Sequence, residues 1–243
     1  ITMPDASPAE AGTGPVTDLG VPSVAPNFDA IPVCGQLISE SLRRDAIQPP
    51  GRGSEGYQLP DQGTVDALAA SFSAAIAGDF PQSVVQATMG GYEICQTPNP
   101  NVRILLWQPK IATSGRARVV WRYDGANPII LGSPHNIFDG TGLAAIRVLD
   151  GIRARLFVSA GTHRCANTIE AGCSGTTTVC SPEPQPYPQS DMAHMTKTIY
   201  QTAHRVFADG YPGDWVISFH GMTRDGISVS DGTTTNDDPD AQL

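Results

Sequence analysis

The sequence predicts an α/β fold with a mixed, mainly parallel sheet that carries helices on both faces, plus an extended proline-rich N-terminal arm. Three observations lead to this fold class. From Pro128 onward, short apolar runs alternate with segments of helical length, the order typical of βαβ units. Before that point, two apolar runs are separated by a turn. Prolines are dense over residues 1–33.

Residues 1–33 form the predicted arm. Its prolines stand at positions 4, 8, 15, 22, 26 and 32. Because proline lacks an amide proton and fixes φ, this density excludes a helix or a central strand. We expect the arm to lie over its own domain or to reach a neighbouring copy, which would give a homo-oligomer held through the arm. Residues 34–243 are expected to form one α/β domain. We expect this domain to be incomplete at its C-terminal end, because no further helix or strand is predicted after the last strand.

Two helices are expected next. Residues 34–48 are compatible with a short helix that Pro49 and Pro50 end. A clearer helix begins at about Thr64, whose hydroxyl can cap it, and ends at Gly78. Its apolar side chains keep helical spacing and are Val65, Leu68, Ala69, Phe72 and Ile76.

The remaining elements follow from apolar runs and turn residues. Residues 102–107 and 116–122 are predicted strands joined as a hairpin. The predicted βαβαβ segment consists of strand 128–133, helix 141–150, strand 154–160, helix 190–208 and strand 214–220. Parallel strands with right-handed crossovers place their carboxyl ends at one edge of the sheet, where ligands of open α/β sheets bind.

Composition excludes two classes of partner. The net charge of −9 and the absence of a basic run argue against nucleic acid, because binding to phosphates needs a basic face. No apolar run approaches the roughly 18 to 20 residues of a membrane span. The first residue is Ile1 rather than Met, which predicts a processed chain from which an export signal has been removed.

The five cysteines predict disulfides in an oxidising compartment, and therefore a secreted or periplasmic protein. Cys165, Cys173 and Cys180 lie close together in a segment rich in Gly, Ser and Thr, where a bridge would fix an irregular loop. Cys34 and Cys95 are candidates for a second, longer closure, which would leave one thiol unpaired. A thiolate metal site is disfavoured because no C-x-x-C pair is present.

Three histidines follow apolar runs and predict a metal site. They are His135, His163 and His220. Imidazoles at the ends of parallel strands can converge, and Asp139 supplies a carboxylate four residues after His135. Neutral imidazole and carboxylate are ordinary zinc donors, so Zn²⁺ is the expected ion, with another divalent metal as the alternative. The competing interpretation is that Asp139 caps the following helix and His135 bonds a backbone carbonyl.

Polar residues around His163 predict anion recognition. Arg164 can hold a carboxylate through two parallel hydrogen bonds, and Asn167 can hold a second polar atom of the same group. The alternative for Arg164 is a surface ion pair. His163 is interpreted as either a metal ligand or an acid/base group.

Residues 190–194 are expected to open a helix with Ser190 as its cap. Asp191 or His194 would then orient a metal ligand by a hydrogen bond to its atom that does not bind the metal. His204 is expected to be a residue of the helix surface.

The order of these motifs resembles that of the zinc carboxypeptidase and N-formylglutamate amidohydrolase-like metallohydrolases over residues 128–222. The resemblance implies His135, Asp139 and His220 as metal ligands and Arg164 with Asn167 as a carboxylate clamp. This chain departs from the family pattern in two ways. The His-to-acid spacing is one residue longer than H-x-x-E, and no glutamate stands on a strand beyond His220.

Only Asp225 and the acidic tail follow His220. Either the general base is a different group, with Asp225 as the candidate, or this chain lacks the part that carries it.

Two functions of different classes follow. The first is metal-dependent hydrolysis of an amide bond next to a carboxylate, in a peptide, an N-acyl amino acid or a poly-glutamate type substrate. The second is a non-catalytic extracellular assembly subunit on the same scaffold, whose arm or sheet edge packs on a neighbour.

Overall fold

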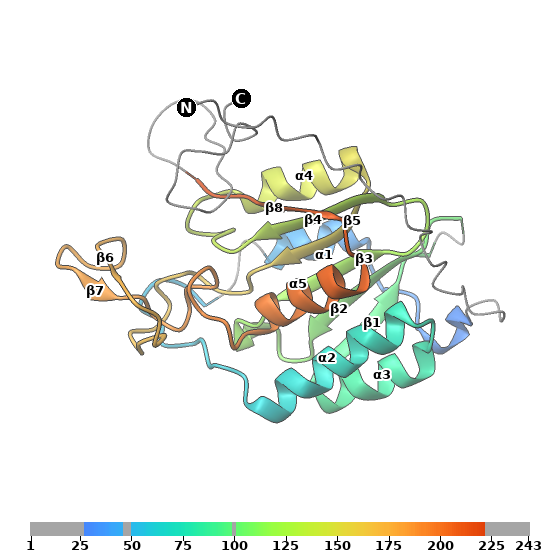
Figure 1. Cartoon of the computed structure of the whole chain (residues 1–243), viewed down its shortest axis with the longest axis horizontal. Coiled ribbons are helices and arrows are strands. Elements are labelled where there is room, and N and C mark those ends of the chain that lie inside the picture. Colours follow the sequence, from blue (N-terminus) through green and yellow to red (C-terminus); the bar gives the residue numbers. More distant parts are fainter. Residues whose placement is uncertain (1–26, 46–49, 99–100, 222–243) are drawn as a thin grey trace, which may run out of the picture.

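The computed structural model describes residues 27–45, 50–98 and 101–221. Over these residues the chain forms a six-stranded sheet between two layers of helices, and an irregular excursion projects from one end (Figure 1). The predicted α/β class with a mixed sheet is confirmed. Residues 1–26 of the predicted arm and Asp225 lie outside the described residues, and no described helix has the length and hydropathy of a bilayer span.

The sheet combines an antiparallel and a parallel half. Its strands, in spatial order, are β1 (Tyr92–Gln96), β2 (Ile104–Pro109), β3 (Arg118–Arg122), β5 (Ala154–Ser159), β4 (Asn127–Ser133) and β8 (Trp215–Ser218). The pairs β1–β2, β2–β3 and β3–β5 are antiparallel. Parallel pairing is confined to β5–β4 and β4–β8, so the antiparallel share of this mixed sheet is larger than expected.

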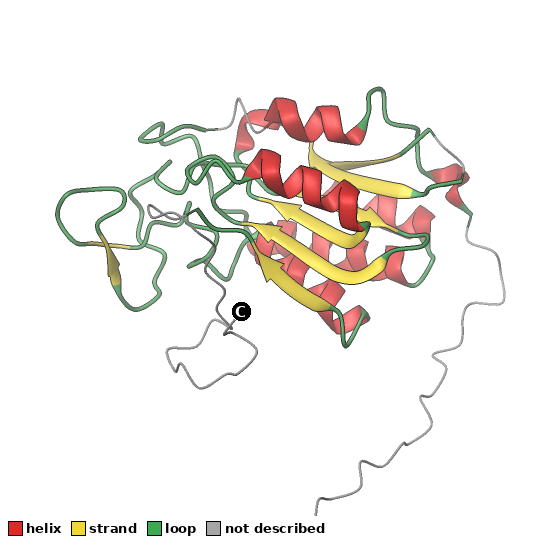
Figure 2. Cartoon of the chain, turned by 90° about the horizontal axis from the view of Figure 1, so that it is seen from above, coloured by secondary structure: helices red, strands yellow, loops and turns green. Residues whose placement is uncertain are grey.

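Helices cover both faces of the sheet, as Figures 1 and 2 show. They are α1 (Ile38–Asp45), α2 (Gln62–Ile76), α3 (Phe80–Met89), α4 (Gly142–Ile152) and α5 (Ile199–Gly210). Alternate strand residues point to opposite faces, so Trp107, Trp121 and Leu156 pack with α2, α3 and α5. Their neighbours Leu106, Val120 and Phe157 pack with α1 and α4.

The larger core is built around aromatic rings. Phe72 of α2 and Phe207 of α5 contact Trp107 edge to face, at ring-centroid distances of 5.5 and 6.4 Å. The indole nitrogen of Trp107 donates to the hydroxyl of Ser71 over 3.0 Å, so the buried ring leaves no unsatisfied donor. Each such ring contributes about 1.5–3 kcal/mol through burial alone.

Helix α2 differs from expectation at its start, because Asp61 rather than Thr64 is its cap. The carboxylate of Asp61 accepts from the backbone nitrogen of Thr64 over 2.7 Å. Helix α3 and strand β1 were not predicted, although Asp79 caps α3 and Pro81 stands in its first turn, both ordinary helix-start signals.

The largest departure concerns the helix predicted over residues 190–208. Helix α5 begins only at Ile199, where the hydroxyl of Thr198 accepts from the backbone nitrogen of Gln201 over 3.1 Å. Ser190 is therefore not a helix cap. Its buried hydroxyl accepts from the backbone nitrogens of Ala166 and Asn167 and donates to the carbonyl of Arg164, which joins two loops.

His204 is another departure, because its imidazole packs beneath strand β4 instead of lying on an open helix surface. A Cβ added at Gly132 of β4 would lie 2.8 Å from Nε2 of His204, so only glycine allows this approach. Nδ1 of the ring lies 3.0 Å from the carbonyl of Tyr200 and therefore carries the proton. Burial lowers the pKa of His204 to about 4, although the hydrogen bond to Tyr200 acts in the opposite direction.

Two disulfides form among the described cysteines; Cys34–Cys95 is the longer closure that the sequence suggested, and the structure selects one pair among the three clustered cysteines. Cys34 pairs with Cys95 and ties the segment before α1 to strand β1. Cys165 pairs with Cys180 and closes the loop after β5, which also carries the short strands β6 (Thr176–Thr177) and β7 (Gln185–Pro186). Cys173 is the half-buried free thiol.

The two disulfides should differ in their contribution to stability. The Cys34–Cys95 bridge closes a loop with a sequence separation of 61, against 15 for Cys165–Cys180. Loop-closure entropy predicts losses of about 4 and about 3 kcal/mol when each pair is replaced by serines. Urea unfolding of the two double variants measures the difference, and a larger loss for C165S/C180S would contradict this account.

His204 should make stability depend on pH. Its pKa is lower in the folded chain than the ordinary 6.5, so the unfolded chain binds the proton first as pH falls. Stability attributable to this residue is therefore complete above pH 6.5 and is lost between about 6.5 and 4. The loss amounts to at most about 3 kcal/mol, and less to the extent that the ring keeps contact with solvent.

The comparison that isolates this effect is urea unfolding of the unmodified chain and of His204→Gln at pH 7.5 and 4.5. Other groups titrate equally in both proteins. An equal loss of stability in the two would show that His204 does not stay neutral in the fold.

Candidate metal centre

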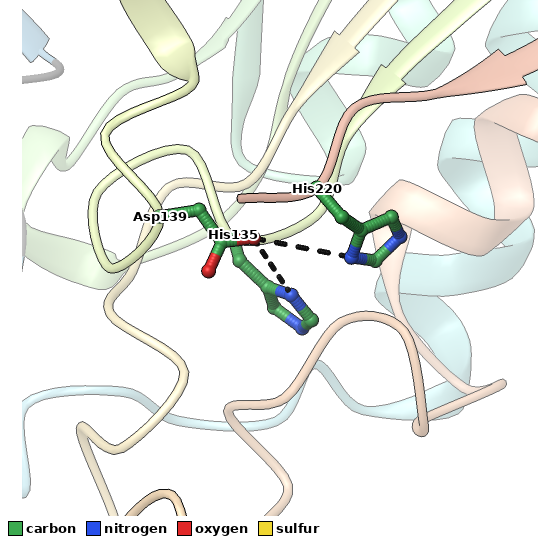
Figure 3. Close-up of side chains that lie close together, drawn as sticks. All are labelled: His135, Asp139 and His220. Carbon is green, nitrogen blue, oxygen red and sulfur yellow. Dashed lines mark ion pairs between the residues drawn. The ribbon is translucent and has the colours of Figure 1, made fainter. Parts of the chain in front are cut away.

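The predicted ligands His135, Asp139 and His220 come together at the carboxyl edge of the parallel strands (Figure 3). One potential ligand atom from each lies within 4.8 Å of the others. Nδ1 of His135 is 3.5 Å and Nδ1 of His220 is 3.9 Å from Oδ2 of Asp139. His135 follows β4 and His220 follows β8, and these strands are hydrogen-bonded neighbours, so the sheet itself brings the two rings together.

The loop after β4 places His135 and Asp139 on one side. The backbone nitrogen of Asp139 donates to the carbonyl of His135 over 2.9 Å, a single helical turn that aligns residues four apart. Oδ2 of Asp139 accepts from the backbone nitrogen of Gly221 over 2.8 Å, which joins this loop to the end of β8. A Cβ at Gly221 would lie 2.8 Å from Cβ of Asp139, so the junction requires glycine.

These contacts answer the competing interpretation of the motif. Helix α4 begins after Thr141, and Asp139 does not cap it. His135 bonds no backbone carbonyl through its ring; its Nε2 lies 2.7 Å from Oδ1 of Asp191. Neither contact of that alternative, the helix cap at Asp139 or the backbone bond at His135, is therefore present among the described residues.

His135 presents a free lone pair toward Asp139 and His220. A carboxylate only accepts hydrogen bonds, so Nε2 of His135 donates to Asp191 and carries the proton. In the neutral ring Nδ1 is then the acceptor. This atom is buried, has no hydrogen-bond partner within residues 27–45, 50–98 and 101–221, and lies 3.5 Å from Oδ2 of Asp139. A carboxylate behind an imidazole is the arrangement that fixes the tautomer of histidine metal ligands.

Asp191 is a fully buried anion with several partners. Its Oδ2 accepts from Nη2 and Nε of Arg164 over 2.6 and 3.1 Å, and Nδ1 of His194 lies 3.1 Å from Oδ1. Burial favours the neutral acid, but the hydrogen bond from His135 and the positive charge of Arg164 outweigh it. The pKa of Asp191 is thus held well below its usual value, and the group stays ionised.

His220 is the accessible member of the group, with 48% of its side chain exposed. Its ring meets that of His135 edge to face at 5.0 Å, and its Nε2 lies 3.3 Å from the hydroxyl of Ser218. Burial of half the ring lowers the pKa of His220, and the neighbouring imidazole of His135 acts in the same direction. The neutral imidazole that metals bind is therefore favoured.

The donor set fits a divalent metal such as zinc. Two ligand atoms at about 2.1 Å from a tetrahedral Zn²⁺ lie roughly 3.4 Å apart, close to the separations of Asp139 Oδ2 from the two imidazoles. Two imidazoles and one carboxylate are a common catalytic set that leaves a position for water. The exposed side of His220 is where such a position would open to solvent.

Other predicted site residues are engaged within the protein. Arg164 contacts Asp191 through two guanidinium nitrogens, which is a buried pair and not a surface one. The amide of buried Asn167 accepts from the backbone nitrogen of Ser190 and donates to the carbonyl of Tyr57. Both ends of Asn167 are occupied, so these contacts give no support to its predicted role in substrate binding.

His163 lies beside the group of three and does not belong to it. Its Nδ1 accepts from the backbone nitrogen of Cys165 over 3.0 Å, so the interpretation of His163 as a metal ligand finds no support in its contacts. Partial burial and then the charges of Arg52 and Arg164 lower the pKa of His163. The ring also contacts that of Phe138 edge to face at 5.2 Å.

Sequence reasoning missed Arg52 and Ser218. Arg52 lies in the glycine-rich loop before α2 and donates to the carbonyl of Cys180 over 2.9 Å, which places its charge near His163. A lone cation between Gly51 and Gly53 was the available signal. Ser218 stands two residues before His220 and could have been considered with it.

Comparison of the chain with protein-family models, with curated proteins and with solved structures finds no match. The resemblance to the zinc carboxypeptidase and N-formylglutamate amidohydrolase-like enzymes therefore stays a hypothesis, and the argument for function rests on the geometry of the site.

Replacement of Asp191 by asparagine should weaken metal binding. Loss of the carboxylate behind His135 is expected to raise the Kd for Zn²⁺ about 10- to 100-fold. The change also leaves Arg164 without its buried partner, so a loss of stability of about 3–5 kcal/mol accompanies it. Competition with a chromophoric chelator measures the Kd, at a temperature where circular dichroism shows the variant folded.

The matched control is Asp209→Asn, an exposed carboxylate on α5. This substitution should change neither the Kd for Zn²⁺ nor the stability of the fold. A folded Asp191→Asn chain with the zinc affinity of the unmodified protein would show that Asp191 does not support the site.

Proposed function

We propose that this chain is a metal-dependent hydrolase that cleaves an amide bond adjacent to a carboxylate, with Zn²⁺ as the expected ion. The observation that carries the proposal is Nδ1 of buried His135, which has no hydrogen-bond partner among the described residues and lies near Asp139 and His220 while Asp191 holds Nε2. A buried polar atom without a partner is rare in proteins and calls for a ligand.

His135, Asp139 and His220 would hold the metal. The bound ion would supply an activated water and polarise the substrate carbonyl. The residues of the chain fix the ligand geometry: Gly221 anchors Asp139, and Arg164 with Asp191 anchors His135. This support from outside the ligand set is what a catalytic metal requires.

His163 fits the role of a hydrogen-bond donor to the reacting group. A backbone N–H only donates, so Nδ1 of His163 holds the lone pair and Nε2 of the neutral ring carries the proton. Because its pKa is lowered, His163 is neutral at pH 7 and can donate to a developing oxyanion or leaving amine. The proposed general base, Asp225, lies outside the described residues.

The surroundings favour a substrate that bears a carboxylate. Arg52 and Arg164 both influence His163 electrostatically, so positive charge gathers on this side of the site. Arg164 uses Nε and Nη2 for Asp191, and its remaining N–H groups can bind a substrate anion. Peptides, N-acyl amino acids and poly-glutamate fragments all fit this description. The two disulfides support a secreted or periplasmic location.

One observation favours the second function, that of an extracellular assembly subunit. Among the described strands, β8 forms an edge of the sheet and pairs with β4 only. Its Trp215, Val216 and Ile217 are 70, 57 and 41% exposed. An apolar edge strand is a surface on which another chain can pair.

Loss of either imidazole should abolish metal binding. Elemental analysis of the purified native chain is expected to give one equivalent of zinc, and His135→Ala and His220→Ala should each lose it. His204→Gln is the matched control, because it removes an imidazole that is not one of the three proposed ligands, and should keep the ion. Zinc retained in either ligand variant would remove that residue from the ligand set.

Activity decides between the two functions. The zinc-loaded chain should cleave N-acyl amino acids or C-terminal peptide bonds, and a chelator should stop turnover. A zinc-loaded chain that cleaves none of them, and whose self-association is lost in Trp215→Ser, would support the assembly subunit.

A further inference from the structure

A cavity lies on the face of the sheet that α1 and α4 cover, toward the end of the strands that is opposite the candidate metal centre. It has a volume of about 130 Å³ and lies between α1, α4 and the sheet. Its lining includes Leu42, Ile104, Val120, Arg122, Ile146 and Leu149. Arg122 ends strand β3, which is antiparallel to β5, so this end of β3 lies away from the edge that carries His135. The cavity is separate from the candidate metal centre.

Arg122 is the unusual member of this lining. Arg122 is only 6% exposed, and its Nε is buried with no hydrogen-bond partner among the described residues. No ion pair joins Arg122 to a carboxylate in the part of the chain that the structure describes. A guanidinium stays charged in proteins, so Arg122 makes this part of the lining suited to an anion.

The carboxylate of the lining forms no ion pair with Arg122 in the described structure. Asp150 of α4 also borders the cavity and acts electrostatically on Arg122, but it is exposed and makes no ion pair with it in the described structure. Arg153 acts on Arg122 in the opposite direction. Two guanidinium groups against one carboxylate leave this region with excess positive charge.

The walls specify the rest of the ligand. Leu42, Ile146 and Leu149 are apolar. Besides Arg122 and Asp150, the polar groups of the lining are the hydroxyls of Ser39 and Thr97. A small inorganic anion would leave the apolar walls unfilled, whereas a hydrocarbon would leave Arg122 unpaired. An engineered cavity of about 150 Å³ holds benzene, so a ligand of roughly six to eight non-hydrogen atoms fits.

We propose that this cavity binds a short aliphatic carboxylate of about four to six carbons, with its carboxylate on Arg122 and its chain among the residues of α1 and α4. The guanidinium then gains a charge-assisted hydrogen bond, and the apolar walls gain a dry partner. The site requires no metal and is independent of the proposed hydrolase activity.

Titration of the full chain with hexanoate, followed by amide chemical shifts, tests the site. Hexanoate should give saturable shifts in α1, α4 and β3. Hexanol lacks the carboxylate and acetate lacks the alkyl chain, so each should bind at least about tenfold more weakly than hexanoate. The same titration of Arg122→Met should also lose about tenfold or more in affinity for hexanoate, while hexanol binding is kept.

Arg147→Met is the matched control, because Arg147 is an exposed arginine of α4 that is not part of the lining. It should bind hexanoate as the unmodified chain does. Should Arg122→Met not fold, Ile146→Phe fills the cavity from α4 and should abolish the hexanoate shifts.

Three outcomes would overturn the proposal. They are the absence of saturable shifts, equal affinity for hexanol and hexanoate, and shifts confined to the loop around His135.

Discussion

The hydrogen bond between His135 and Asp191 is the constraint on which the candidate site depends. Asp191 is fully buried, and an isolated buried carboxylate would take up a proton. The hydrogen bond from His135, with further contributions from His194 and from Arg164 at Oδ2, prevents this. The ionised carboxylate then fixes the proton of His135 on Nε2 and turns the lone pair of Nδ1 toward Asp139. One buried ion pair thereby determines the chemical character of a side chain on a different loop.

This dependence explains why so much irregular chain surrounds the site. Arg164 follows β5, Asp191 lies before α5, and His135 follows β4, so three connections must meet in register. Ser190 joins two of them by accepting from Ala166 and Asn167 and donating to Arg164. The Cys165–Cys180 bridge closes the excursion between them. Loops normally have more freedom than strands, and these bonds give the excursion the rigidity that a preorganised ligand needs.

The sequence was informative where periodic structure places the residues. An apolar run followed by histidine locates His135 and His220, and neighbouring parallel strands bring their ends together without any knowledge of the loops. Cysteine positions likewise suggested the Cys34–Cys95 bridge, but they left open which two of Cys165, Cys173 and Cys180 pair. The start of α5 was misplaced because Ser190 and Asp191 have the composition of a helix start, yet their side chains are used by the site. Local propensity lost to tertiary contacts there.

Contacts between loops carry no period, which is why the Arg164–Asp191 pair and the Arg52–Cys180 contact could not be derived. Asp191 was expected behind a metal ligand, but nothing in the sequence connected it with Arg164, which had been interpreted as a substrate clamp. The pairing of charges across an irregular excursion depends on the path of that excursion. The same limit applies to Arg122, whose burial follows from the packing of α1 and α4 over β3 and not from its own neighbours in sequence.

Asp191 and Arg122 together show how the chain treats buried charge. Both residues are at least nine-tenths buried. The carboxylate of Asp191 has His135 and Arg164 as hydrogen-bond partners and is ionised. Nε of Arg122 has none, and its guanidinium cannot become neutral as a carboxylic acid can. A protein can tolerate a buried carboxylate by protonating it, but a buried guanidinium must find an anion or water. Among the described residues, the guanidinium of Arg122 is therefore the stronger indication of a bound anion, because no change of protonation can remove its charge.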